Sequence, residues 1–302
     1  MADSVSLTSQ LSLLDKAELC VIGGGLAGVA AALTASDAGL DTILIEERGA
    51  LGWEVSHGLE LFLERGAEIP RALERMLERL SALNATRDGI LDPVALECLL
   101  DKMMQEAKVR VHFRAFAGAI DAAKGFARLT TKSGPLAVQA RVFIDATETS
   151  RLVGGASNTS TATSTERACL LCAVETPAAL TTVNVDGVAK AEVRPTLWPH
   201  EAHVRVSVNT SSALAAESTV RFALARTIEA LRKVPGFEKA SLALSAHESF
   251  VLNPEKLDLS KLAENVFVAG PRVLGKKPSL QERITLGAQA ATRAIAELRV
   301  NA

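Results

Sequence analysis

The sequence predicts an α/β fold, in which a central parallel sheet with an antiparallel hairpin insertion is joined to a smaller α+β region. Three observations support this prediction: a strand, a glycine turn and a helix near the start, a strand-turn-strand pattern further on, and a change of composition after residue 155. Because 302 residues exceed what one core usually organises, we expect two domains. We place the first at 1–155 and 262–302 and the second at 156–261.

The first element is an apolar strand that ends in closely spaced glycines, in the stretch "ELCVIGGGLAG". Gly23, Gly25 and Gly28 fit the spacing G-x-G-x-x-G, and strong helix formers continue to Gly39. Such glycines permit a tight turn, a close approach of the backbone to a diphosphate, and close packing of helix on strand. The N–H groups that begin the helix then bind phosphate. A second strand, "DTILIEE", completes the βαβ unit of a Rossmann-like dinucleotide-binding domain.

This apolar stretch also raises the possibility of a membrane helix. A spanning helix needs about 20 uninterrupted apolar residues, whereas three glycines cluster at the start of this one and Asp37 ends it. The dinucleotide interpretation is therefore the better one. Glu46 ends the second strand, where a carboxylate can accept hydrogen bonds from an adenosine ribose and disfavours a 2′-phosphate. FAD or NAD is expected rather than NADP.

Later elements follow from local signals. A helix is expected after Asp92, which can cap it, with Pro93 in its first position. A hairpin is expected around Lys132-Ser133-Gly134, leading into the apolar strand "ARVFIDAT". The polar stretch "ASNTSTATST" reads as a connector, followed by several short strands and an amphipathic helix at about 215–232. The chain returns to a strand, "NVFVAG", and a last helix that Ser279 and Glu282 open as a capping box.

Charge and composition restrict the partners. The 33 basic and 35 acidic residues are scattered, so we expect a small-molecule substrate and neither nucleic acid nor a membrane. The N-terminus lacks a basic segment followed by an apolar run, which favours a cytoplasmic protein. His200 and His203 are close in sequence, as are Cys169 and Cys172, but on a strand such pairs point to opposite faces. We expect no metal site.

Four stretches in this order carry a resemblance to a known family: "VIGGGLAGVAAAL" with Glu46, "GALGW", "VFIDATETS", and "NVFVAGPRV" followed by "TLGAQAATRAI". Together they resemble the FAD-dependent oxidoreductases of the glutathione-reductase-like fold. The resemblance implies that the chain binds FAD noncovalently and is an enzyme. It also implies cofactor contacts at a set of positions along these stretches: Gly23, Gly25, Gly28, Glu46, Glu47, Arg48, Gly52, Trp53, Ala117, Thr147, Gly270 and Gly287.

Three positions depart from the family pattern. Glu148 and Trp53 stand where the family usually has glycine, and Pro271 stands where it usually has an acid. Each change could weaken FAD binding, although Trp53 could also stack on the flavin ring. Three functions follow: a flavoenzyme that transfers a hydride between a small organic substrate and flavin N5, a flavin-fold subunit of a larger redox complex without catalysis of its own, or, less favoured, an NAD-binding dehydrogenase. A homo-oligomer or a redox partner subunit is compatible with the first two.

Two residues are candidates for the proton transfer that accompanies hydride transfer. His57 follows "GWEVS", the loop that the family places near the flavin, and its ordinary pKa near neutrality suits a general base. Glu54 is the second candidate. Arg272 and Arg283 flank the expected flavin end and could bind a substrate carboxylate. The alternatives are a surface histidine for His57, a solvated or ion-paired carboxylate for Glu54 and an ion pair for Arg283.

Overall fold

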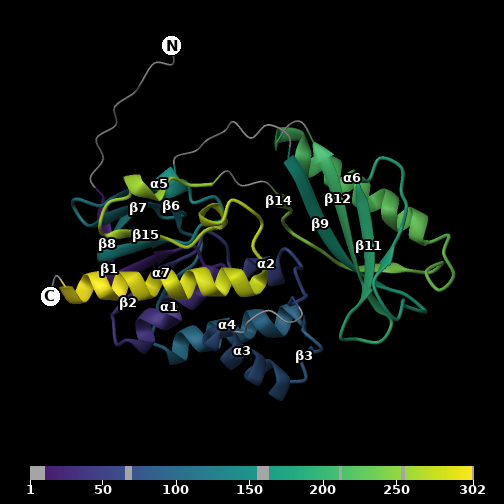
Figure 1. The fold of residues 1–302 in the computed structure, drawn as a ribbon, viewed down its shortest axis with the longest axis horizontal. Coiled ribbons are helices and arrows are strands. Elements are labelled where there is room, and N and C mark those ends of the chain that lie inside the picture. Colours follow the sequence, from purple (N-terminus) through teal and green to yellow (C-terminus); the bar gives the residue numbers. More distant parts are fainter. Residues whose placement is uncertain (1–10, 65–69, 155–162, 211–212, 253–255, 301–302) are drawn as a thin grey trace, which may run out of the picture.

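The computed structural model describes residues 11–64, 70–154, 163–210, 213–252 and 256–300. Two sheets lie side by side, each with its own helices (Figure 1). Most of the predicted polar connector, the start of the chain on which the cytoplasmic expectation rests, and the expected domain boundary near 155 lie outside the described residues.

The first sheet has a parallel centre. Its strand order is β5-β2-β1-β8-β7-β6, and β15 also pairs with β8. The strands β1, β2, β5, β8 and β15 run parallel to their partners in this centre. Their bounds are Ser12–Ile22, Thr42–Ile45, Arg110–His112, Gly134–Asp145 and Val266–Val268. The predicted α/β class is confirmed.

The hairpin insertion is also present. β6 (Phe116–Asp121) and β7 (Phe126–Thr131) pair antiparallel, and β7 continues into β8 through a turn in which Thr131 faces Gly134. This turn is the one predicted from Lys132-Ser133-Gly134. The long strand β8 pairs with β7 in its first half and with β1 from Leu136 to Asp145, so it joins the hairpin to the parallel centre.

Alternation along β1 assigns the two faces of this sheet. Leu19 and Val21 pack with the helices, whereas Cys20 and Ile22 pack with the hairpin strands on the other face. Helices α1 and α7 lie along each other, with α3 and α4 beside them (Figure 1). The bounds of α1, α3, α4 and α7 are Leu26–Asp37, Arg71–Ala82, Pro93–Glu106 and Leu280–Val300.

Two predicted helix starts are confirmed by their hydrogen bonds. Asp92 accepts the N–H groups of Val94 and Ala95 at the start of α4, at 3.0 and 2.8 Å. At the start of α7, Ser279 N–H donates to Glu282 and Glu282 N–H donates to the Ser279 hydroxyl, at 2.9 and 3.2 Å. This reciprocal pair is a capping box.

The second sheet is antiparallel and has the order β10-β11-β12-β9-β13, with β14 also paired to β9. Helix α6 (Ala213–Leu231) packs on one face of it, near the predicted position. In chain order, β9 to β14 are Thr163–Cys172, Thr181–Thr182, Lys190–Pro195, Glu201–Thr210, Ser241–Ser245 and Phe250–Leu252. Among the described residues, no helix combines the length and the apolar character that a membrane span requires.

Short elements complete the fold. The helical turn α2 (Trp53–Ser56) follows β2 and lies near the second sheet in Figure 1. The other short elements are β3 (Thr86–Arg87), β4 (Ile90–Leu91), α5 (Arg151–Gly154), η1 (Leu259–Lys261) and η2 (Pro271–Val273).

Candidate cofactor site

The glycine turn between β1 and α1 forms a close junction of strand and helix. Gly23 has φ +108°, and a Cβ there would lie 2.6 Å from the carbonyl oxygen of Ala146. A Cβ on Gly28 would lie 1.7 Å from the carbonyl oxygen of Gly23. Both distances are far below a van der Waals contact, so only glycine permits this junction. These two predicted glycines therefore set the path of the chain below the site.

Gly25 is the N-cap of α1, and its missing side chain leaves room for another residue. A Cβ on Gly25 would lie 2.6 Å from Oε1 of Glu54. The Leu26 N–H, in the first turn of α1, donates to both carboxylate oxygens of Glu54, at 3.2 and 3.0 Å. The carboxylate of Glu54 therefore sits on the N-terminus of the first helix, where helix N–H groups attract anions.

Glu54 is enclosed with two charged neighbours. It is 1% exposed, and Arg283, itself 3% exposed, places Nη1 3.3 Å from its Oε1. The same guanidinium binds Glu148 through two contacts, at 2.5 and 3.0 Å. Burial raises the pKa of Glu54 although Arg283 opposes the rise. Burial also disfavours the charge of Arg283, but the carboxylates of Glu148 and Glu54 outweigh it and raise the arginine's pKa.

Glu46 directly follows β2, and its carboxylate binds the backbone around the glycine turn. Its Oε2 accepts the N–H of Gly24 at 2.5 Å, and its Oε1 accepts the N–H of Arg48 at 2.6 Å. Burial raises the pKa of Glu46 although both of these hydrogen bonds favour the charged form. The predicted acid thus lies at the end of the strand beside the glycine turn.

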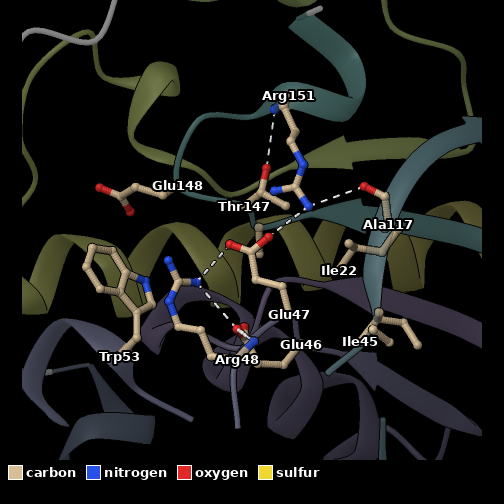
Figure 2. A pocket seen from close by; sticks show the side chains of 14 residues that line it. Ile22, Ile45, Glu46, Glu47, Arg48, Trp53, Ala117, Thr147, Glu148 and Arg151 are labelled. Carbon is tan, nitrogen blue, oxygen red and sulfur yellow. Dashed lines mark hydrogen bonds and ion pairs between the residues drawn. The ribbon is translucent and has the colours of Figure 1, made fainter. Parts of the chain in front are cut away.

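A pocket opens between the ends of β1, β2 and β8. Glu47 spans one side of it, since its carboxylate contacts Arg48 and Arg151 at 3.1 Å each (Figure 2). Arg151 also donates to the carbonyl of Ala117 at 3.2 Å. The pocket is lined by Ile22, Gly23, Gly25, Ile45, Glu46, Glu47, Arg48, Trp53, Ala115, Ala117, Ala146, Thr147, Glu148 and Arg151.

Most predicted cofactor residues meet in this pocket, but four do not line it: Gly28, which packs against Gly23, and Gly52, Gly270 and Gly287. Gly52 has φ +61° and packs against Leu100. A Cβ on Gly270 would lie 2.5 Å from the carbonyl of Thr147, and one on Gly287 would lie 1.9 Å from the carbonyl of Ala27. These last two glycines let backbones pack closely, and their contacts with the cofactor stay predictions.

Trp53 lies at the pocket's edge and already has ring partners. Its ring centroid is 5.0 Å from that of Phe250, and the guanidinium of Arg48 lies 4.7 Å from the Trp53 ring. Arg48 in turn forms an ion pair with Glu248 at 2.5 Å. The aromatic face expected for flavin stacking thus packs against the second sheet.

His57 lies next to the second sheet. Its ring centroid is 4.9 Å from that of His247, and its carbonyl accepts the N–H of His247 at 2.8 Å. Burial and the neighbouring His247 lower the pKa of His57, so that the ring is neutral at pH 7. His57 is half-buried and does not line the pocket. The candidate arginine Arg272 donates to the carbonyl of Thr149 at 3.4 Å.

Two charged residues at the site were not predicted from the sequence, and neither were the apolar lining residues Ile22, Ile45, Ala115 and Ala146. Arg151 and Glu248 belong to no motif, and their partners are far away in the chain. The one available signal is the position of Arg151, which soon follows the strand-end segment "DATETS".

Comparisons with known proteins identify the family. The family model described as FAD dependent oxidoreductase matches residues 18–267. The chain belongs to this family. FAD is therefore its cofactor, and the FAD-dependent oxidoreductase assignment agrees with the resemblance seen in the sequence. A comparison with curated protein sequences found no match.

Solved structures of FAD-dependent oxidoreductases and related proteins share the fold. A geranylgeranyl bacteriochlorophyll reductase-like protein from Thermoplasma acidophilum has a TM-score of 0.69 and 16% identity, covering 95% of this chain and 80% of that one. p-Nitrophenol 4-monooxygenase from Pseudomonas putida has a TM-score of 0.65 and 15% identity, and the match covers 96% of this chain and 82% of that one. Aklavinone-11 hydroxylase, solved with FAD and aklavinone, has a TM-score of 0.61 and 16% identity, and the match covers 94% of this chain and 62% of that one. At such identities the likeness shows a common fold.

The geometry suits the adenosine of FAD better than it suits the diphosphate. The pocket beside Glu46, Glu47 and Ala117 is bounded by strand ends and is suited to the adenosine half. The N–H of Leu26, at the position expected for the diphosphate, is bound by Glu54. The glycine turn and the pocket thus agree with the cofactor, and one side chain stands in the diphosphate position.

Proposed function

We propose that the protein is a flavoenzyme that transfers a hydride between a small organic substrate and flavin N5. The observation that carries the proposal is the glycine turn at α1, joined to a pocket that the ends of β1, β2 and β8 line. Bound FAD supplies the hydride chemistry, and the protein supplies position and electrostatic field. In this proposal Gly23, Gly25 and Gly28 hold the diphosphate, Glu46 the ribose and Ala117 the adenine.

We assign the proton transfer to His57. The half-buried ring lies where the first sheet's loops meet the second sheet, and its lowered pKa leaves it neutral and able to accept a proton at neutral pH. Glu54, the other predicted base, is 1% exposed and is held by Leu26 and Arg283. A substrate between the two sheets would approach His57 more easily than the enclosed Glu54.

A second candidate function is a flavin-fold subunit without catalysis of its own. The cluster of buried Glu54 and Arg283 with half-buried Glu148 favours it, because Glu54 fills the N-terminal end of α1 with the protein's own charge. Such a subunit would associate with a larger redox partner.

Anaerobic reduction separates the two functions. The protein is saturated with FAD and mixed with NADH, NADPH or small alcohols and amines while the flavin absorbance is followed. Rapid bleaching by one donor supports the flavoenzyme. No bleaching by any donor, together with co-purification of a redox protein, supports the subunit and contradicts the enzyme.

A further inference from the structure

The N-terminus of α1 has an internal anionic occupant. Glu54 comes from the short turn α2, later in the chain, yet both its oxygens accept the N–H of Leu26. Its Oε1 also occupies the space that opens above Gly25, where a Cβ would be only 2.6 Å away. A carboxylate in this position satisfies the same N–H group and helix dipole that a phosphate would.

We propose that Glu54 is an internal competitor of the FAD diphosphate, so that the cofactor binds only when the Glu54 side chain leaves the N-terminus of α1. The proposal rests on the proposed use of this helix for the diphosphate. Two anions cannot share one N–H group and one space above Gly25. The affinity for FAD is then reduced by the free energy with which Glu54 holds the site.

Arg283 makes the exchange feasible. It has one contact with Glu54, at 3.3 Å, and two with Glu148, at 2.5 and 3.0 Å. When Glu54 leaves, Arg283 keeps the stronger of its two partners, so its buried charge stays compensated. Its Nη1 also faces the anion position, where it attracts whichever negative group replaces the carboxylate.

Of the two carboxylates that contact Arg283, Glu54 is the one whose charged form is disfavoured by burial. Burial raises its pKa, and the negative charge of Glu148 adds to that rise against the effect of Arg283. Against this burial the carboxylate has its own backbone N–H, that of Leu26 and one guanidinium contact at 3.3 Å, which is longer than either contact between Arg283 and Glu148. The carboxylate is therefore suited to temporary occupancy.

The test measures ligand affinity in Glu54→Ala, with Glu54→Gln as a second variant that keeps the side-chain volume. Binding of FAD, ADP and adenosine is measured by calorimetry, and circular dichroism checks that each variant is folded. ADP carries a diphosphate and adenosine does not. We expect Glu54→Ala to bind FAD and ADP at least about tenfold more tightly than the wild type, since a charge-assisted hydrogen bond no longer competes. Glu54→Gln should gain less, because its uncharged amide still fills the space above Gly25. The affinity for adenosine should stay unchanged.

Glu47→Gln is the matched control. It removes a carboxylate from the neighbouring pocket, but Glu47 contacts Arg48 and Arg151 and not the helix N-terminus. If Glu47→Gln tightened ADP binding as much as the Glu54 variants, the effect would be general electrostatics and the proposal would fail. Unchanged ADP affinity in the Glu54 variants would also overturn it. Tighter ADP binding without any FAD binding would retain the competitor and reject the proposed function.

Discussion

Arg205 in β12 of the second sheet donates to Glu60, in the loop that follows α2, at 2.7 Å, and this pair joins two segments that are far apart in the chain. Lys277 binds the other oxygen of Glu60 at 2.7 Å and also reaches Glu166. We call Glu60, Glu166, Arg205 and Lys277 the inter-sheet cluster. Its side chains are mostly buried, so its charges are weakly screened by solvent.

Replacing Glu60 by Gln should destabilise the protein. The change removes the carboxylate that Arg205 and Lys277 share, and leaves Glu166 to compensate two partly buried cations. We expect the free energy of unfolding to fall by about 3 kcal/mol, measured by urea denaturation. Glu106→Gln, which alters an exposed ion pair with Arg79, is the control and should leave the midpoint unchanged. Equal midpoints for Glu60→Gln and the wild type would contradict the role of the cluster.

The same carboxylate predicts an acid dependence of stability. Burial alone would raise the pKa of Glu60, but Arg205 and Lys277 lower it from 4.5 to about 2. Because the pKa is depressed in the folded state, the stabilisation is complete above the unfolded value and is lost as the pH falls from about 4.5 to 2. Unfolding free energies measured across this range should decline by roughly 3 kcal/mol more in the wild type than in Glu60→Gln. Parallel declines would refute this assignment.

Two glycines should tolerate no side chain. In Gly28→Ala and Gly287→Ala the new Cβ would lie 1.7 Å from the carbonyl oxygen of Gly23 and 1.9 Å from that of Ala27. Helix α1 would have to move from β1 or from α7, and we expect a loss of about 3 kcal/mol or more in unfolding free energy. Gly118→Ala is the matched control, since its Cβ would meet nothing within 4 Å. A small effect at Gly28 would mean that α1 lies farther from β1.

His57 should control the acid limb of activity. Burial and His247 lower its pKa from 6.5, and a base acts only when it is deprotonated, so the rate of flavin reduction should fall as the pH drops through a midpoint below 6.5. His57→Gln should lower the rate by about 100-fold and remove this limb, with FAD affinity little changed. His200→Gln is the control, because His200 is exposed and bonded to the carbonyl of Val174. An unchanged pH profile in His57→Gln would exclude it as the base.

Local backbone chemistry made much of the fold predictable. The glycine turn, the cap at Asp92, the capping box at Ser279 and the hairpin near Gly134 depend on neighbours a few residues away, which the sequence displays directly. The position of Glu54 could not be predicted in this way. Its acceptance of the Leu26 N–H depends on how α2 returns over α1 after the second strand.

Contacts between the two sheets could not be predicted from the sequence either. Glu248 pairs with Arg48 and Arg205 with Glu60 across most of the fold. Charged residues are common on strand faces, and their sequence spacing does not show which faces will meet. The sequence therefore predicted the residues near the glycine turn better than those that close the site from the second sheet.

Calorimetric titration of the purified protein with FAD tests the central claim most directly. The account predicts saturable binding of one FAD per chain, tighter in Glu54→Ala than in the wild type. Absence of FAD binding in both proteins, with the fold intact by circular dichroism, would contradict the account.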